Sequence, residues 1–324
     1  MNIYYLENKF NKIGFLDVGA TIYSWQVKHL NNRNIVLSNA NLQDYFNAGS
    51  SFLGATVGRV ANRIKDGRFS LDGKNYQLDK NFDGGFNAGH GGPDGFWRKT
   101  FTLVESSSTH LEFKLLSPDG DQGYPGNLEL GVIYTLLEQG LRIDYHVNTD
   151  TKTIVNITNH SYFNLDGSNT VLDHVLDADF SHYLPFDKNK AVTGQKIKVE
   201  NSALDFSGGV RIKGIIYDDY LQDKNTRGLD HCVYFKDEKK VKLMGKDLIL
   251  ELTTSYPCIQ LYGTSFPSPQ KLLGHDKMHL YHALALEPQL AVDAINFPDL
   301  GSIILSPDQE YHHFIEYKLK DQSE

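Results

Sequence analysis

The sequence predicts an all-β fold in which two large antiparallel sheets pack against each other. Hydrophobic and polar residues alternate along many short segments, whereas helical periodicity is weak throughout the chain. The 28 glycines, 18 tyrosines and 18 phenylalanines favour strands and turns over long helices. Because many antiparallel strands are joined by long connections, we expect a large antiparallel β-sandwich.

Two β-hairpins have the clearest patterns. Residues 128–136 and 141–147 each place alternate hydrophobic side chains on one face, and Glu138-Gln139-Gly140 between them is typical of a turn. Residues 69–76 are centred on Asp72-Gly73, a dipeptide typical of a tight hairpin turn. Both segments therefore predict paired antiparallel strands.

Further segments have shorter strand patterns, and residues 40–46 predict a short turn of helix. Residues 185–228 are irregular but keep hydrophobic anchors, so we expect long excursions from a sheet rather than a linker. We expect one domain over residues 1–324, because sandwiches and barrels commonly exceed about 200 residues as single units. The further strand segments are residues 21–28, 101–104, 111–116, 231–236, 240–244, 247–253, 257–262 and 283–287.

Composition argues against several classes of partner. The net charge of −8 and the pI near 5.9 leave no basic surface for nucleic acid or anionic membranes. No apolar run approaches the ~20 residues that span a bilayer, and the N-terminus lacks the pattern of a signal peptide. Cys232 and Cys258 could form one bridge, which is too little for a disulfide framework. We therefore expect a cytoplasmic protein.

The segment NITNHSYFNL, residues 156–165, is the most informative part of the chain. Its central His160 belongs to the residue type best suited to proton transfer near neutral pH. The alternative is a structural histidine in a strand-to-turn corner, and the segment alone favours that alternative. Four polar neighbours could orient the ring or contact a polyhydroxylated ligand, and two aromatic neighbours could pack on a sugar face: Thr158, Asn159, Ser161 and Asn164, and Tyr162 and Phe163.

Two carboxylates are candidates for chemistry. Glu287 follows the apolar run of LALE, so it lies either in solvent at a strand end or in a cleft, where burial would make it a competent base. Asp230 in GLDHCVYF precedes an apolar strand, and either caps a turn or binds ligand hydroxyls. His231 beside it would point to the opposite face of that strand.

Other polar residues are weaker candidates for ligand binding. His90 lies in the glycine-dense loop NAGHGGPDGFW, which matches neither a phosphate loop nor a dinucleotide fingerprint. Arg59 and Arg63 in GATVGRVANRI either bind hydroxyls or pair with surface acids. Asn62 and Gln260 carry amides of the kind that orient polar ligands.

Metal and hydrolase sites are poor fits to this sequence. The chain has 13 histidines, but it lacks HExxH and any cysteine pair at zinc spacing. The pairs His279/His282 and His312/His313 are weak as ligand sets, and no G-x-S-x-G elbow is present. We therefore expect no metal site.

The order of these segments along the chain resembles the galactose mutarotase family of aldose 1-epimerases. The resemblance runs from about residue 14 to about residue 315, and its two long motifs, SPDGDQGYPG and NHSYFNL, are specific. The short motifs HGG and LEPQ have weight only beside them. The matching segments are GRVANRI (58–64), HGG (90–92), SPDGDQGYPG (117–126), NITNHSYFNL (156–165), GLDHC (228–232), Gln260 and LEPQ (286–289).

The resemblance implies a large antiparallel β-sandwich with an open sugar-binding cleft and no metal or coenzyme. It implies that the chain interconverts the α and β anomers of free aldoses such as galactose and glucose. Glu287 matches the catalytic base, His160 the catalytic acid, and His90 a second histidine near the sugar oxygens. The resemblance also favours Arg63 over Arg59. The implied hydroxyl-binding residues are Asn62, Arg63, Asp230 and Gln260.

The chain departs from the family pattern near the expected cleft. Phe96 and Trp97 are adjacent where the family usually has intervening residues, and residues 262–266 and 288–292 also differ. The proton-transfer pair remains, so we expect activity. The preferred sugar stays open, with a disaccharide among the candidates.

Three alternatives share parts of this pattern. A hexose-6-phosphate 1-epimerase would need cations for the phosphate, for which Arg211 and Lys213 are the nearest guesses. A glycosidase using Glu287 and Asp230 would leave both histidines unexplained, and a sugar-binding sensor would explain the altered segments. The expected partner is a small aldose, and we expect a monomer or a homodimer.

Overall fold

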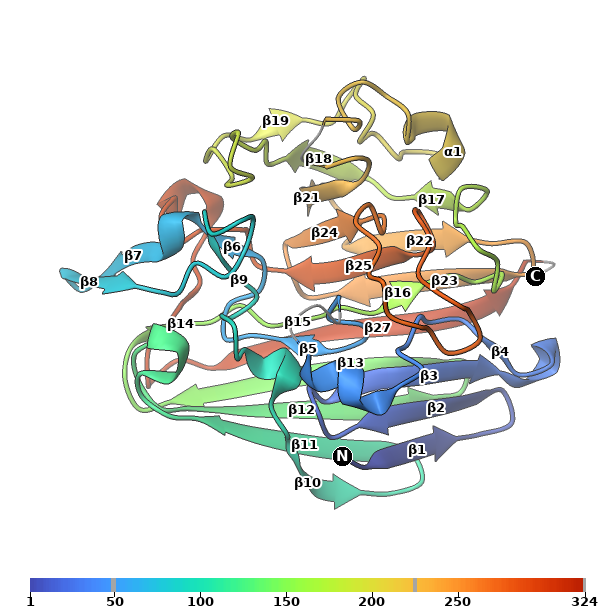
Figure 1. The fold of residues 1–324 in the computed structure, drawn as a ribbon, viewed down its shortest axis with the longest axis horizontal. Coiled ribbons are helices and arrows are strands. Elements are labelled where there is room, and N and C mark those ends of the chain that lie inside the picture. The colour runs from blue at the N-terminus through green and yellow to red at the C-terminus, as the bar shows by residue number, and fades with distance from the viewer. Residues whose placement is uncertain (48–50, 224–225, 323–324) are drawn as a thin grey trace.

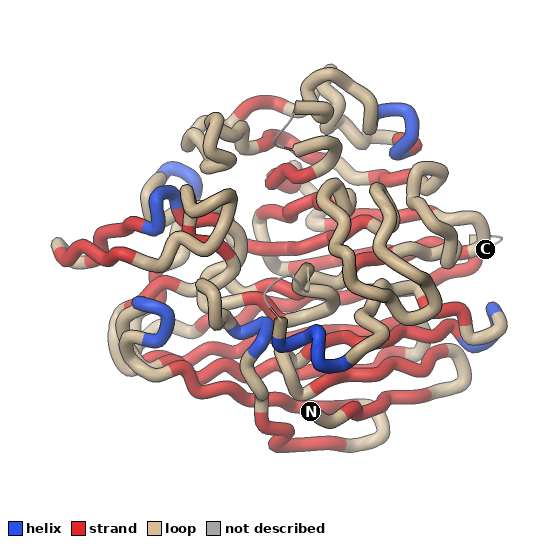
Figure 2. Tube along the Cα trace, in the orientation of Figure 1, coloured by secondary structure: helices blue, strands red, loops and turns tan. Residues whose placement is uncertain are grey.

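The computed structural model describes residues 1–47, 51–223 and 226–322. Strands dominate this part of the chain, and its helices are single turns (Figures 1 and 2). None of the described helices is long and apolar enough to cross a membrane. The helical turns are α1 (Ile212–Ile215) and the 3₁₀ turns η1 (Lys28–Leu30), η2 (Leu42–Phe46), η3 (Lys65–Gly67), η4 (Phe96–Arg98), η5 (Asp121–Gly123) and η6 (Pro298–Leu300).

A nine-stranded antiparallel sheet is the largest element of the fold. It contains the predicted hairpin, in which residue 137 pairs with residue 140 and the alternate side chains of both strands are buried. Its strands, in spatial order, are β10 (Thr102–Ser106), β11 (His110–Ser117), β12 (Leu128–Leu137), β13 (Gly140–Thr149), β27 (Tyr311–Asp321), β23 (Leu248–Thr254), β22 (Lys240–Met244), β17 (Val175–Asp177) and β20 (Val210–Arg211).

Two smaller antiparallel sheets complete the sandwich. The six-stranded sheet has the order β16 (Tyr162–Phe163), β25 (Leu284–Gln289), β24 (Cys258–Tyr262), β21 (Asp230–Phe235), β18 (Phe180–Tyr183), β19 (Ile197–Lys198). The four-stranded sheet has the order β1 (Ile3–Glu7), β2 (Asn11–Leu16), β3 (Thr21–Val27), β4 (Arg33–Asn34).

Short strand pairs connect these sheets, and one of them, the hairpin β7–β8 with the predicted Asp72-Gly73 turn, projects from one side (Figure 1). The pairs are β5 (Thr56–Val57) with β15 (Thr158–Asn159), β6 (Arg63–Ile64) with β9 (Ala88–Gly89), β7 (Arg68–Leu71) with β8 (Lys74–Gln77), and β14 (Thr153–Ile154) with β26 (Ile304–Leu305).

Three aromatic side chains join the three large sheets in one core. Trp25 of β3, Phe163 of β16 and Tyr317 of β27 have ring centroids 5.1–6.4 Å apart. All three side chains are fully buried in the main hydrophobic cluster. Trp25 Nε1 donates to Asn11 Oδ1 at 2.9 Å, so the polar atom of the largest ring also has a partner.

The all-β class, both hairpins, all the predicted strand segments and the helical turn at η2 are confirmed. Residues 185–223 and 226–228 form mostly loops with short strands and the helical turn α1, in line with the predicted excursions from a sheet. The sequence analysis missed β1, β2 and the central strand β27, although Ile315, Tyr317 and Leu319 alternate with polar residues there. The bridge considered between Cys232 and Cys258 does not form, because both are free buried thiols.

We expect Phe163→Ala to lower the free energy of unfolding by about 3–5 kcal/mol, because it opens a cavity where three sheets meet. Leu116→Ala is the matched control, since Leu116 is 68% exposed and its truncation should change stability little. Urea unfolding monitored by fluorescence measures both variants. An equal effect of the two substitutions would contradict this description of the core.

Candidate active site

A cavity of about 690 Å³ opens beside the six-stranded sheet, a volume typical of small-molecule sites. The structure brings all seven residues singled out by the sequence analysis to its lining, although they come from six separate segments. Each of these residues is at least nine-tenths buried. They are Asn62, Arg63, His90, His160, Asp230, Gln260 and Glu287.

Strand alternation aims three of these side chains into the cavity. Gln260 of β24 lies opposite Glu287 of β25, and Asp230 lies on the neighbouring strand β21. Their chain neighbours Leu261 and Leu286 point the other way and belong to the main core. Because side chains alternate between faces along a strand, one face of this sheet is apolar and the other carries the polar site.

A chain of buried polar contacts crosses the cavity floor. The Arg63 guanidinium contacts Asp83 Oδ2 from Nε at 2.9 Å and Asp230 Oδ2 from Nη2 at 3.2 Å. Gln260 Nε2 donates to Asp230 Oδ1 at 2.7 Å, so both Asp230 oxygens are bound. Burial alone would lower the pKa of Arg63, but Asp230 and Asp83 raise it, and the guanidinium stays charged.

A short strand pair positions the segment that carries Asn62, Arg63 and His90. Arg63 of β6 pairs with Gly89 of β9, and the backbone N–H of His90 donates to the Asn62 carbonyl at 2.9 Å. Asn62 Oδ1 accepts from Arg63 Nη1 at 3.1 Å. Asn62 and His90 both have positive φ, at 62° and 49°, so the chain turns sharply at each of them.

His160 lies in the short connection between β15 and β16. Its backbone N–H donates to the Ala55 carbonyl at 2.9 Å, and its own carbonyl accepts from the Gly54 N–H at 3.0 Å. The imidazole stacks on Tyr162 at a centroid distance of 4.9 Å. Backbone bonds to residues 54 and 55, far away in the sequence, therefore fix the ring at the cavity wall.

His160 and Glu287 face each other. His160 Nε2 lies 3.4 Å from Glu287 Oε1, and both side chains are almost completely buried. Glu287 Oε2 and Gln260 Oε1 are buried without a hydrogen-bond partner in the described structure. Unpartnered buried polar atoms are costly, so these atoms favour a bound ligand that supplies hydrogen bonds.

Burial shifts both members of this pair toward their neutral forms. Loss of solvation raises the pKa of Glu287 well above its ordinary value of 4.5, and the charge of Asp230 raises it further. Loss of solvation also lowers the pKa of His160 to about 4. Between the lowered pKa of His160 and the raised pKa of Glu287 the pair holds a single proton.

His90 has a defined tautomer. Its Nδ1 accepts from the backbone N–H of Asn62 at 3.3 Å, which leaves the proton of the neutral ring on Nε2. Burial lowers the pKa of His90 well below 6.5, and the nearby His160 and Arg63 charges lower it further. Neutral His90 can therefore offer an N–H donor to an oxygen of a ligand.

Several lining residues were missed by the sequence analysis. Asp83 ties Arg63 in place, yet its sequence FDGGF reads as an ordinary turn. Lys190 Nζ lies 4.3 Å above the Phe266 ring. The missed aromatic residues of the lining are Phe52 and Phe82.

Arg59 does not line the cavity. Its buried guanidinium donates to the carbonyl groups of Pro125 at 2.7 Å and Gly126 at 3.0 Å, and to Ser117 Oγ at 2.7 Å. It therefore organises the SPDGDQGYPG segment, which also lies outside the lining. Gln122 of that segment accepts from the Asp94 N–H at 2.9 Å and so supports the loop after His90.

Polar neighbours of His160 form hydrogen bonds to backbone carbonyl groups and do not line the cavity. This corrects the prediction that they could contact a ligand. Asn159 Nδ2 donates to the Gly54 carbonyl at 2.9 Å, and Thr158 Oγ1 donates to the Pro288 carbonyl at 2.7 Å. Asn164 Nδ2 donates to the Ser168 and His282 carbonyls, both at 2.7 Å. Neither these side chains nor Ser161 lines the cavity, and Phe163 lies in the core instead.

The departures from the family pattern differ in their distance from the cavity. Tyr262, Phe266 and Trp97 line it, as the sequence analysis expected. Residues 288–292 do not line it, and the backbone of Leu290 is bonded to the Asn156 side chain at 2.8 and 3.1 Å. Arg211 and Lys213, the guessed phosphate ligands, also lie outside the lining. Of these residues, only Tyr262, Phe266 and Trp97 can alter ligand preference by direct contact.

The cavity lacks a compact set of metal ligands among the described residues. Two groups of three metal-ligating side chains occur in that part of the chain, and neither contains a lining residue. The arrangement of His160, Glu287 and His90 suits proton transfer between a buried acid and base.

Comparisons with known proteins cover nearly the whole chain. Residues 2–318 match the family model described as aldose 1-epimerase. The galactose mutarotase of Rattus norvegicus is 35% identical over 94% of this chain and 90% of its own length. The aldose 1-epimerase of Escherichia coli K12 is 33% identical over 94% of this chain and 91% of its own.

Solved structures with a similar fold also cover nearly the whole chain. An aldose epimerase homologue from C. elegans has a TM-score of 0.88 and 28% identity, covering 99% of each chain. The galactose 1-epimerase of Lactobacillus acidophilus NCFM has a TM-score of 0.86 and 28% identity, covering 98% of this chain and 94% of its own.

We expect the His90 ring to be neutral at pH 6, with its proton on Nε2, because its pKa is lowered and Nδ1 is an acceptor. Long-range ¹H–¹⁵N NMR on labelled protein distinguishes the two tautomers and the imidazolium. An imidazolium at pH 6, or a proton on Nδ1, would contradict the assigned hydrogen bond.

Proposed function

The chain belongs to the aldose 1-epimerase family, a family of isomerases, and we propose that Glu287 and His160 perform the proton transfers of anomer interconversion in its cavity. One observation carries the proposal, namely the 3.4 Å approach of His160 Nε2 to Glu287 Oε1 at a buried polar site. The substrate is a small aldose, and the proposed reaction interconverts its α and β anomers.

Ring opening needs a base and an acid close together. The C1 hydroxyl loses its proton to the Glu287 carboxylate, the C1–O5 bond breaks, and O5 takes a proton from the His160 imidazolium. The C1–O1 bond becomes the carbonyl of the open-chain aldehyde. Because O1 and O5 are bonded to the same carbon, groups that act on both must be neighbours, as this pair is.

Ring closure reverses the roles. After rotation about C1–C2, neutral His160 removes the proton from the O5 hydroxyl and protonated Glu287 returns a proton to O1. The protonation state at the start of closure is the state that burial favours in the free cavity. One proton shared by the pair therefore serves both directions, and no net proton is gained or lost.

The other polar residues are proposed to hold the sugar. Arg63 and Asp230 are fixed by mutual contact and by Asp83 and Gln260, so their orientation is set before a ligand arrives. Neutral His90 and Asn62 offer further polar atoms beside them. The aromatic side chains of the lining supply apolar surface for the C–H groups of the ring.

A glycosidase fits this site poorly. Both oxygens of Asp230 are bound, one by Gln260 and the other by Arg63, so this carboxylate is engaged in a network. A glycosidase would need it free as the second member of a carboxylate pair. The histidine partner of Glu287 has a role in epimerisation that hydrolysis would leave unexplained.

A hexose-6-phosphate 1-epimerase is the second candidate, and Lys190 is the observation in its favour. Lys190 lines the cavity, and its Nζ has no ion-pair partner among the described residues. Arg63 is already paired with Asp83 and Asp230, so Lys190 is the one lysine or arginine of the described lining left for a dianionic phosphate. The charges therefore favour a free aldose.

The proposal also covers the cellular location, the oligomeric state and the partners of the protein. The free buried thiols of Cys232 and Cys258 support a reducing, cytoplasmic location. We propose a monomer or homodimer that needs no nucleic acid or membrane partner, in line with the net charge of −8. Light scattering on the purified chain measures the oligomeric state.

We expect Glu287→Gln to reduce the acceleration of mutarotation by about 10²–10⁴-fold, because the amide cannot accept the O1 proton. Polarimetry or NMR on freshly dissolved α-D-galactose and α-D-glucose measures the rate, with a protein-free sample as reference. Sugar binding should be largely retained. Glu129→Gln is the control, since Glu129 lies exposed on β12, and full activity of Glu287→Gln would reject the proposed base.

We expect kcat/KM to fall on both sides of a pH plateau. As the pH falls through about 4, His160 gains a proton while Glu287 is already protonated, so the pair has no base left. As the pH rises through the raised pKa of Glu287, the pair loses its only proton and has no acid left. Initial rates corrected for the protein-free rate at each pH test this, and a monotonic profile would contradict it.

We expect kcat/KM for glucose 6-phosphate to be at least about tenfold below that for glucose, a difference of about 1.4 kcal/mol. The reason is that Arg63 is already neutralised. NMR exchange measurements on both sugars, each corrected for its spontaneous rate, give the ratio. A preference for the phosphate that is lost in Lys190→Ala would establish the second candidate instead.

A further inference from the structure

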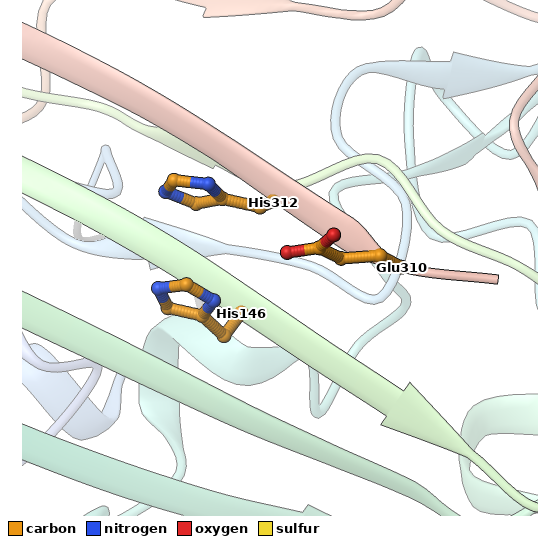
Figure 3. A group of neighbouring side chains, drawn as sticks. All are labelled: His146, Glu310 and His312. Atoms are coloured by element: carbon orange, nitrogen blue, oxygen red, sulfur yellow. The ribbon is translucent and has the colours of Figure 1, made fainter.

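A cluster of three metal-ligating side chains lies away from the cavity, on the outer face of the nine-stranded sheet. It consists of His146 on β13, His312 on β27 and Glu310 just before β27 (Figure 3). One nitrogen of each histidine and a carboxylate oxygen of Glu310 all lie within 4.8 Å of one another.

The strand register produces this cluster. His146 lies directly opposite His312 in the antiparallel pairing of β13 with β27. Glu310 precedes His312 by two positions, so extended backbone carries both side chains on the same face of the sheet. Two of the three ligands therefore lie on paired strands whose backbone positions are fixed by the ladder, and Glu310 lies one residue before the second strand.

Neighbouring groups orient one of the ligands. His312 Nε2 bonds to Asp144 Oδ1 at 2.8 Å, which leaves its Nδ1 as the lone-pair nitrogen of the neutral ring. Arg142 holds Asp144 through contacts of 2.7 and 2.8 Å, so the carboxylate is itself fixed. A carboxylate behind a histidine is the arrangement that orients metal-ligating imidazoles.

The cluster matches the ligand chemistry of zinc. Two imidazoles and one carboxylate are a known zinc set, which leaves a fourth position for water. At Zn–N and Zn–O distances of about 2.0–2.2 Å the donor atoms of a tetrahedral site lie about 3.3–3.6 Å apart. The two rings now stack with centroids 4.3 Å apart and planes 9° apart, so rotation of these solvent-facing side chains must bring the donors together.

We propose that His146, Glu310 and His312 form a Zn²⁺ site that ties β13 to β27 on the outer face of the sheet. The other candidate group, Glu105, His110 and Glu112, has a single imidazole and is the poorer zinc set. Binding of the ion to the folded state alone would stabilise the central strands of the sheet. The site is separate from the proposed proton-transfer pair.

Isothermal titration of the chelator-treated full chain with ZnCl₂ tests the proposal, with MgCl₂ as the hard-cation control. We expect one saturable Zn²⁺ site and no comparable Mg²⁺ binding. The double variant His146→Asn/His312→Asn and the single variant Glu310→Gln should lose or strongly weaken it. Asp144→Asn should weaken it by about 10–100-fold, as expected for a group that orients a ligand.

His29→Asn is the matched control, because His29 also faces a carboxylate, Asp321, at 2.8 Å but belongs to neither candidate ligand group. It should leave Zn²⁺ affinity unchanged. As a second readout, Zn²⁺ should raise the thermal midpoint of the wild-type chain and not that of the double variant. Absence of saturable binding in the wild type, or full binding in the double variant, would overturn the proposal.

Discussion

The register of β21, β24 and β25 is the constraint on which the site and the core both depend. On one face these strands present leucine, isoleucine and valine to the main hydrophobic cluster. On the other face they present Glu287, Gln260 and Asp230 to the cavity. A slip of one residue would exchange the two faces, placing Glu287 in the core and Leu286 in the cavity. Such an exchange would place polar side chains in the apolar core and leucine side chains against the polar site, so the register that buries the core also fixes the geometry of the site.

The cost of burying charge explains how the cavity is organised. Arg63 is retained at a buried position because two carboxylates and an amide satisfy it, and removal of any one of them would leave an uncompensated group. The same network binds both carboxylate oxygens of Asp230. In contrast, Glu287 and His160 have few compensating contacts, and their neutral forms are favoured. The site thus separates fixed charges, which are proposed to bind, from a labile proton, which is proposed to move.

Much of the fold was accessible from the sequence, because strand alternation and turn dipeptides are local signals. The hairpin of β12 and β13 and the Asp72-Gly73 turn followed from such patterns. The strand β27 was missed although it alternates too, and the helical turn at η2 was found. The site residues were selected by motif order. No local pattern marked Asp83 or Phe52, because their importance arises from contacts with distant segments.

The sequence by itself determined the all-β class, the principal hairpins and the set of polar residues that accompany NITNHSYFNL. Only the tertiary structure decided which of them lie together around one cavity. It placed Arg63, which the resemblance already favoured, in the cavity lining and Arg59 outside it. It showed that Thr158, Asn159 and Asn164 hydrogen-bond to backbone carbonyls, and it placed His160 Nε2 3.4 Å from Glu287 Oε1. It also placed His312 opposite His146 across the β13–β27 pairing. The sequence analysis had considered His312 only together with its chain neighbour His313. The physical reason is that burial, pKa and hydrogen-bond partners are properties of the packed environment, which strand pairing over long sequence separations creates.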